Sequence, residues 1–277
     1  MTPSAARAGA PPRRKRFGQH FLHDPRILGR IVQALAALPG DHLVEIGPGR
    51  GALTARLLAI PGITLDAIEI DRDLAALLRA QFSDSPRHAL HAGDALGFDF
   101  SALALTRGGP LRIVGNLPYN ISTPLLFHLL QHADAITDLT LMLQREVAGR
   151  LAAAPGQSEY GRLSVMLAPR LQVTRLFDVG PGAFQPPPRV WSAVVRLTVR
   201  RQPLFPLSPH YAQVVAAAFG QRRKTLRNAL SQMLTAEQIR ACGIDPGARP
   251  GTLAPEAFNT LAAVTSRAAL DRARGER

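Results

Sequence analysis

The chain has a single cysteine, Cys242, among its 277 residues. One thiol excludes an intramolecular disulfide framework and a cysteine-rich zinc site, and it is typical of a reducing compartment. No segment approaches the roughly 18 to 20 consecutive apolar residues of a membrane-spanning helix, and residues 1–16 lack the apolar run of a signal peptide. We therefore expect a cytoplasmic protein without a membrane segment, with a flexible basic arm over residues 1–15.

Lysine is also scarce, since only Lys15 and Lys224 occur, yet the formal net charge is +13. Arginine therefore supplies nearly all of the positive charge. Such a charge attracts polyanions over long distances, and nucleic acid is the first partner to expect. The 46% hydrophobic composition is enough to bury the core of one large domain and a small second one.

Apolar runs of strand length alternate with helical patterns over residues 27–144. This alternation is typical of an α/β fold with a doubly wound parallel sheet, which carries its ligand at the carboxyl ends of the strands. The expected strands are residues 42–46, 64–70, 89–91, 111–114 and 139–143, with helices over 52–60 and 71–82.

The order of elements changes after Arg145. Two helices separated by a loop at 155–160 precede two strands that can form a hairpin at the sheet edge. A proline-rich linker and a small helical domain complete the chain. The expected strands are 171–177 and 190–198, split by the proline-rich segment 184–188; the linker is 202–209, and the helical domain is 211–274.

A glycine-rich turn, residues 47–51, follows the first strand of the sheet and opens a helix. Glycine allows the backbone to approach a ligand closely. Gly47, Gly49 and Ala52 also satisfy the dinucleotide fingerprint, with Glu69 about 20 residues on as the ribose-binding acid. The motif alone therefore does not separate a nicotinamide-dependent dehydrogenase from a methyltransferase.

Three acids at successive strand ends favour the methyltransferase. A pyrophosphate on the turn would lie beside Glu45, with Asp94 at the other wall, and like charges repel in a partly desolvated site. S-adenosylmethionine brings cationic sulfonium and ammonium groups instead. Glu69 can accept hydrogen bonds from both ribose hydroxyls, and Asp94 can accept one from the adenine amino group. Each acid taken singly is more often a loop or cap residue.

The segment Asn116-Leu117-Pro118-Tyr119 directly follows the strand at 111–114. An exocyclic adenine amine is a poor nucleophile because its lone pair is delocalised into the ring. The Asn116 side-chain oxygen and the Pro118 carbonyl can bind its two hydrogens and favour the nucleophilic form, while Tyr119 stacks on the base. A plain turn is the alternative explanation. Downstream of the glycine turn, the catalytic explanation is favoured.

Several segments together resemble the KsgA family of small-subunit ribosomal RNA adenine dimethyltransferases, over the whole chain from Phe17 onward. They are residues 17–22 (FGQHFL), the glycine turn, Glu69, Asp94, 116–119, 184–188 (FQPPP) and 219–228 (FGQRRKTLRN). The resemblance implies a class I S-adenosylmethionine-dependent methyltransferase, Rossmann-like, with a small C-terminal α-helical domain. It also implies that the target base lies between Tyr119 and Phe184, and that the cofactor is lined by His20, Leu22, Gly47, Glu69, Asp94 and Asn116.

The resemblance further implies the substrate, two adjacent adenines near the 3′ end of small-subunit rRNA, each methylated twice late in subunit biogenesis. The target then has to be flipped out or lie in a splayed loop. The expected partners are the small ribosomal subunit and its rRNA, bound by a monomer that uses no metal. The implied division is a catalytic domain at 16–200 and an RNA-contacting domain at 201–277.

A basic cluster lies near the start of a predicted helix in the C-terminal domain. It can track an RNA backbone with strong salt dependence, although a solvated helix face is the usual explanation of such a run. A second cluster is at 13–16, and Arg145, Arg150 and Arg162 can extend the surface. The C-terminal cluster consists of Arg222, Arg223, Lys224 and Arg227.

Other signals are weaker. His128 and His132 are four residues apart but have no third ligand, so a helix-surface pair is favoured over a metal site. There is no G-x-S-x-G elbow of a hydrolase, and the single tryptophan, Trp191, is expected in the core. The remaining rivals are a macrolide-resistance-type methyltransferase of large-subunit rRNA, the dehydrogenase, and a non-catalytic ribosome assembly factor with this fold.

Overall fold

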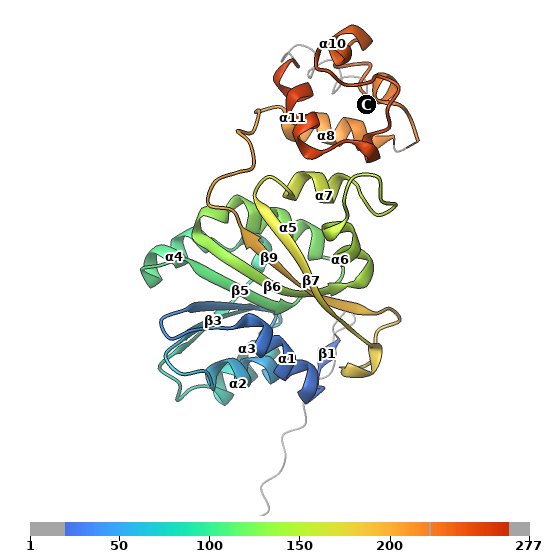
Figure 1. Ribbon diagram of the computed structural model, residues 1–277. Helices are drawn as coiled ribbons and strands as arrows, with labels where there is room; N and C mark the ends of the chain where they lie inside the picture. The colour runs from blue at the N-terminus through green and yellow to red at the C-terminus, as the bar shows by residue number, and fades with distance from the viewer. Residues whose placement is uncertain (1–19, 222, 266–277) are drawn as a thin grey trace, which may run out of the picture.

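The computed structural model describes residues 20–221 and 223–265, and it shows a twisted seven-stranded sheet covered by helices on both faces (Figure 1). The strand order is β4-β3-β2-β5-β6-β9-β7. The predicted arm at 1–15 lies outside the described residues. Within them, no helix is long and apolar enough to cross a membrane.

Five strands form the parallel part of the sheet, and all of them except the edge strand β4 are rich in buried apolar residues. The expected strands 42–46 and 111–114 are confirmed, the second with two further residues. The chain builds the sheet outward on one side of β2 and then returns to the other side. The carboxyl ends of β2 and β5 therefore form a topological switch point, where ligands of such sheets bind. The strands are β2 (His42–Ile46), β3 (Thr64–Glu69), β4 (His88–Ala92), β5 (Leu111–Asn116) and β6 (Ile136–Gln144).

The predicted hairpin is confirmed. β7 (Leu171–Val179) pairs antiparallel with β9 (Ser192–Val199), and β9 pairs antiparallel with β6 at the sheet edge. A second, two-stranded sheet was not predicted. It joins β1 (Phe21–Leu22) to β8 (Phe184–Gln185), which lies inside the segment expected to be only a proline-rich break. This pairing brings the N-terminal segment beside the hairpin connection.

Local sequence explains where the helices begin. The Asp24 side chain accepts from the backbone N–H groups of Arg26 and Ile27, and Pro25 starts the first helix. Asp71 caps the third helix in the same way. The helices before the C-terminal lobe are α1 (Pro25–Leu35), α2 (Ala52–Leu58), α3 (Arg72–Gln81), α4 (Phe100–Arg107), α5 (Ser122–Gln131), α6 (Arg145–Ala152) and α7 (Arg162–Leu167).

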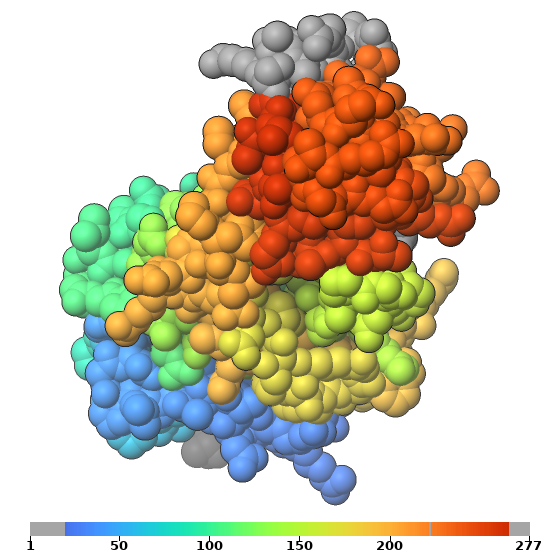
Figure 2. Space-filling view, turned by 45° about the horizontal axis from the view of Figure 1, so that its top comes forward, coloured from blue at the N-terminus to red at the C-terminus, as the bar shows by residue number. Residues whose placement is uncertain are grey.

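The last four helices form a lobe with its own apolar core, which also takes in Val165 of α7. Figure 2 shows this lobe, orange to red, against the yellow-green part of the chain that contains α7. Two buried tyrosines join this lobe to the segment that contains α7. Tyr160 donates to the Leu253 carbonyl at 2.8 Å, and Tyr211 donates to the Val165 carbonyl at 2.9 Å. Residues 200–210 contain no helix or strand. The lobe consists of α8 (Tyr211–Gly220), α9 (Leu226–Ala229), α10 (Ala236–Ala241) and α11 (Pro255–Ala263).

The prediction that Trp191 lies in the core is wrong, because 52% of the residue is exposed. Trp191 immediately precedes β9, so it stands at the end of the sheet rather than between the sheet and a helix. Its neighbours Ser192 and Ala193 are both buried instead, because β9 is covered on both faces at this end.

Candidate active site

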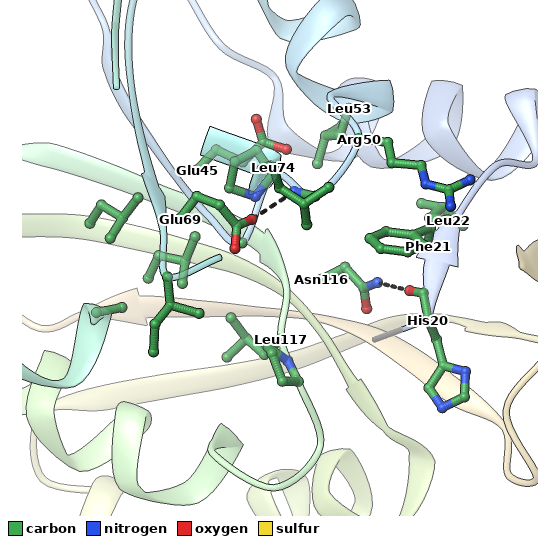
Figure 3. A pocket seen from close by; sticks show the side chains of 18 of the residues that line it. His20, Phe21, Leu22, Glu45, Arg50, Leu53, Glu69, Leu74, Asn116 and Leu117 are labelled. Carbon is green, nitrogen blue, oxygen red and sulfur yellow. Dashed lines mark hydrogen bonds between the residues drawn. The ribbon is translucent and has the colours of Figure 1, made fainter. Parts of the chain in front are cut away.

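A pocket lies at the switch point, where β2, β3 and β5 end (Figure 3). The glycine turn and the start of α2 form one wall, the segment after Asn116 forms another, and β1 closes the side opposite the acids. Among the predicted site residues, His20, Leu22, Gly47, Glu69, Asp94, Asn116, Pro118 and Tyr119 all line it. The sheet therefore brings together residues nearly 100 positions apart in the chain.

The glycine turn depends on backbone conformations that other residues rarely adopt. Gly47, Gly49 and Gly51 have φ angles of +68°, +60° and +79°. A Cβ atom on Gly49 would lie 3.0 Å from the Phe21 ring, and one on Gly51 would lie 2.9 Å from the Phe82 ring. The turn is thus packed against the Phe21 and Phe82 rings, and its residues Gly47 and Gly49 line the pocket.

Phe21 and Arg50 belong to the site although sequence reasoning assigned them no role. The Arg50 guanidinium lies 4.6 Å from the centre of the Phe21 ring, and the ring also packs on Gly49. Both residues line the pocket. Phe21 was quoted within a matching segment, but nothing in the local pattern distinguishes a pocket wall from an ordinary packing residue.

Glu69 is 4% exposed and joins the end of β3 to the glycine turn. Its Oε2 accepts from the Gly49 N–H at 3.1 Å, and its Oε1 accepts from the Asp71 N–H at 2.9 Å. Burial raises the pKa of this carboxyl, and these backbone donors oppose the shift. Each oxygen has a second lone pair, so Glu69 can still accept from two hydroxyl groups of a ligand.

Glu45 is 2% exposed and lies beneath the turn, where it accepts from the Thr54 hydroxyl at 2.6 Å. Burial raises its pKa to about 7, and the neighbouring Glu69 contributes in the same direction. Glu45 is therefore only partly ionised near pH 7. Its charge depends on pH and on what occupies the pocket, so the argument against a pyrophosphate rests on Glu69 and Asp94.

Asp94 lies at the third wall of the pocket, between Gly93 and Ala95. The residue is exposed, and its Oδ1 accepts from the Leu96 N–H at 2.9 Å, which caps a short 3₁₀ turn. The cap fixes the carboxylate but uses only one of its oxygens. The other oxygen can accept from an amino group in the pocket.

The Asn116 amide is held by the N-terminal segment. Its Nδ2 donates to the backbone carbonyl of His20 at 3.0 Å, which leaves Oδ1 as the acceptor (Figure 3). The His20 ring points away from the acidic side of the pocket, and its Nδ1 is 2.9 Å from the Pro186 carbonyl. The backbone of His20 therefore holds the Asn116 side chain, while its ring contacts the Pro186 carbonyl.

Tyr119 is held at both ends. Its hydroxyl is 2.8 Å from the Ser192 Oγ, and its ring stacks on His20 with the ring centres 5.8 Å apart. Burial raises the pKa of the phenol, so Tyr119 is neutral near pH 7. Ser192 was missed because it comes from β9, 73 residues away, and no local pattern indicates the contact.

Pro118 and Phe184, two of the predicted catalytic residues, make contacts outside the pocket. The Pro118 carbonyl accepts from the Ile121 N–H at 3.2 Å and from the Ser122 hydroxyl at 3.0 Å, so its two lone pairs serve the start of α5. Phe184 is 2% exposed and does not reach the pocket, because pairing of β8 with β1 sets it opposite Leu22 within a core cluster.

The basic residues lie away from the pocket lining. Arg223, Lys224 and Arg227 are exposed around the turn that joins α8 to α9. Arg222 lies outside the described residues, as do 13–16 and 17–19. Of the other arginines, Arg150 pairs with Glu146 on α6.

The histidine pair on α5 is not a surface feature as expected. His128 Nε2 is 2.9 Å from the Phe98 carbonyl, His132 Nδ1 is 2.8 Å from the Ser101 hydroxyl, and both rings pack against Phe100. Both are half-buried. Over residues 20–221 and 223–265, no cluster of three or more histidine, cysteine, aspartate or glutamate side chains could hold a metal ion.

Comparisons with known proteins agree on one family. The model of the family described as ribosomal RNA adenine dimethylase matches residues 12–266. The chain is 54% identical to Ribosomal RNA small subunit methyltransferase A of Pseudomonas aeruginosa, over 90% of this chain and 93% of that protein. It is 52% identical to the protein of the same name from Marinobacter nauticus, over 87% of each.

Two solved structures have the same fold over most of their length. A dimethyladenosine transferase from Plasmodium falciparum superposes with a TM-score of 0.72 at 25% identity, over 87% of this chain and 96% of that one. The 23S rRNA methyltransferase ErmE gives a TM-score of 0.69 at 27% identity, over 88% of this chain and 98% of that one.

Proposed function

Because the chain belongs to the ribosomal RNA adenine dimethylase family, we propose that it methylates the N6 amino groups of two adjacent adenines near the 3′ end of small-subunit rRNA. Each adenine receives two methyl groups from S-adenosylmethionine, late in small-subunit biogenesis. The protein is an rRNA methyltransferase with a class I methyltransferase fold. The small subunit is favoured over the large one by relatives at 52–54% identity, whereas ErmE is 27% identical.

The observation that carries this proposal is the orientation of Asn116. Its amide nitrogen is occupied by the His20 carbonyl, so Oδ1 is available to accept a hydrogen from an adenine amine. The second hydrogen needs another acceptor, and Pro118 already serves two donors. We assign that role to the carbonyl of Leu117, which follows Asn116 directly and lines the pocket. Two acceptors on the amine favour the form whose lone pair attacks a methyl group.

The pocket fits S-adenosylmethionine. Bound there, it supplies an electrophilic methyl group on a sulfonium. The glycine turn gives a backbone cradle that side chains would fill, since a Cβ on Gly47 would lie 3.9 Å from the Asn116 carbonyl. Glu69 would hold the ribose hydroxyls and Asp94 the adenine amino group, while Leu22 and the Phe21 ring would exclude water beside them.

Tyr119 positions the target base in this proposal. The stack on His20 and the hydrogen bond to Ser192 fix the Tyr119 ring before a substrate binds. The side chain therefore loses little conformational entropy when the base binds. We assign Phe184 to the support of β1 rather than to the base, because it packs beneath Leu22. No general base is needed, since the methylated amine is acidic enough to lose its proton to water.

We further propose a monomer that acts in the cytoplasm on the small ribosomal subunit. In this arrangement residues 16–200 carry catalysis, and residues 201–277 contact RNA through Arg222, Arg223, Lys224 and Arg227. Three of these four are exposed around one turn of the C-terminal lobe, and the net charge of +13 suits a polyanionic partner.

The test is methyl transfer from labelled S-adenosylmethionine to ribosomal subunits that lack adenine dimethylation, with the product nucleosides identified by mass spectrometry. Small and large subunits are assayed side by side, and Asn116→Ala is the control. We expect dimethyladenosine at two adjacent positions of the small-subunit rRNA only. Transfer to large subunits alone would mean that the substrate is large-subunit rRNA. The absence of any transfer by a protein that binds the cofactor would refute the catalytic proposal.

A further inference from the structure

Trp191 is the largest exposed aromatic side chain at the end of the sheet that carries the pocket. Strand register places it there: Asn116 at the end of β5 is the partner of Met142, and Gln144 at the end of β6 is the partner of Ser192. Trp191 directly precedes Ser192, whose hydroxyl holds Tyr119. Trp191 is therefore next in the chain to the residue that holds Tyr119, the side chain proposed to position the base.

The indole is held in place although half of it is exposed. Its backbone carbonyl accepts from the Arg145 N–H at 2.9 Å, which ties it to the first residue of α6. The six-membered part of the ring lies over Gly180, where a Cβ atom would be 3.6 Å from the ring. Because the ring is already supported on one side, a partner that stacks on it loses little side-chain entropy.

The surroundings of Trp191 are mainly cationic. Arg145 and Arg175 both contact Asp178 near the end of β7, and Arg189 is two residues before the indole in the sequence; all three are exposed. The carboxylate of Asp178 lies 3.5 Å from Arg145 and also pairs with Arg175. Two guanidinium groups share one carboxylate and Arg189 is two positions from the indole in the sequence, which leaves an excess of positive charge near an exposed aromatic face, a combination typical of single-stranded nucleic acid sites.

We propose that Trp191 is a stacking platform for an unpaired base of the RNA that neighbours the target adenine, and that Arg145 and Arg189 bind the adjoining phosphates. The proposal rests on the function proposed above. An adenine that enters the pocket leaves its neighbours without a stacking partner, and an indole one residue from the Ser192–Tyr119 contact can replace the lost stacking. Trp191 is thus a positioning residue, because it holds the strand rather than the reacting atoms.

The sole tryptophan of the chain gives a direct probe, since a base stacked on an indole quenches its fluorescence. The protein is titrated with an RNA hairpin that presents two adjacent adenines in its loop and, as a control, with a fully paired duplex of the same length. We expect quenching by the hairpin that saturates with binding, and little quenching by the duplex. Binding of the hairpin without any change in fluorescence, or equal quenching by both RNAs, would overturn the proposal.

Substitutions extend the test to catalysis. Trp191→Ala is expected to raise KM for small subunits by about 5- to 100-fold, the range of base–aromatic stacking, with a smaller change in kcat. Trp191→Phe keeps a ring and should recover most of the loss, while Val190→Ala, at an exposed apolar neighbour without a ring, should leave KM unchanged. Cofactor affinity and Tm are measured on every variant.

The outcomes separate this inference from the proposed function. A normal KM for Trp191→Ala in an active enzyme would refute the platform and leave the methyltransferase intact. If the wild-type protein methylates no subunit but its tryptophan is still quenched by the hairpin, the RNA contact stands while the proposed reaction fails. If Trp191→Phe is as impaired as Trp191→Ala, the ring serves packing on Gly180 rather than stacking on RNA.

Discussion

The Asn116 side chain donates to the backbone carbonyl of His20 at 3.0 Å, across 96 positions of the chain. This bond determines which end of the amide faces the pocket, because only the nitrogen can satisfy a carbonyl. The N-terminal segment, rather than the catalytic motif itself, thus orients the amide so that its Oδ1 can accept in the pocket.

Asn116→Ala should lower kcat by about 10²- to 10³-fold, the loss typical of one preorganised polar group at a reacting centre. Cofactor affinity, measured by calorimetry, should fall by less than tenfold because most cofactor contacts come from other residues. Asn116→Asp keeps an acceptor but loses the donor to His20, so it should also be impaired. Near-normal turnover in either variant would contradict the proposed role.

Ser192→Ala should free the Tyr119 hydroxyl and lower kcat/KM by about 2- to 10-fold, which corresponds to one hydrogen bond of about 1 kcal/mol. Tyr119→Phe removes the same bond from the other side. In a double-mutant cycle the combined variant should therefore be no worse than the single ones. Fully additive losses would show that the two residues act independently.

The pKa of Glu45 gives a stability prediction. Folding raises it from 4.5 to about 7, so the folded state holds its proton more tightly than the unfolded state. The free energy of unfolding should therefore fall as pH rises from about 4.5 to about 7, by about 3 kcal/mol at most. Glu45→Gln should remove this fall and be more stable than the parent at pH 8. Denaturant unfolding between pH 5 and 8 tests this, and identical pH profiles would disprove it.

The same carboxyl should make cofactor binding depend on pH. A cationic ligand favours the ionised form of Glu45, so the affinity for S-adenosylmethionine should rise between pH 6 and 8. Thr54→Val, which removes the donor to Glu45, should shift this rise to higher pH. Affinities measured at constant ionic strength would show both effects. A pH-independent affinity would mean that the ligand cations lie away from Glu45.

Replacement of Arg223, Lys224 and Arg227 by glutamine should weaken RNA binding and make the slope of log K against log salt shallower by about 2 to 3 units. The three side chains are exposed, so Tm should not change. Arg240→Gln, on another helix of the same lobe and paired with Glu237, is the matched control. An unchanged slope in the triple variant would show that other residues of the protein bind the RNA.

Much of the fold was predictable because its signals are local. The run at 42–46 has the length and apolar content of a buried strand, and the glycines after it require positive φ angles. The acids at the ends of β3 and β4 follow from the rule that carboxyl ends of parallel strands meet. The pocket, with Glu69, Asp94 and Asn116 around it, could therefore be derived before any coordinates.

The unpredicted features depend on contacts between distant segments. Pairing of β1 with β8 joins residues more than 160 positions apart, and it decides that Phe184 is buried while Phe21 faces the pocket. The charge of Glu45 depends on burial, which composition does not reveal. Trp191 was expected in the core, but the register of β9 places it beyond the last paired residue.

Two residue pairs join β1 to β8, and β1 lies beside the pocket that small molecules enter and leave. Dimethylation of two adenines consumes four donor molecules, and each spent donor has to leave before the next enters. β1 forms one wall of the chamber in which this exchange takes place. The wall beside which every exchange occurs is thus a strand of only two residues, and two residue pairs with β8 hold it in place.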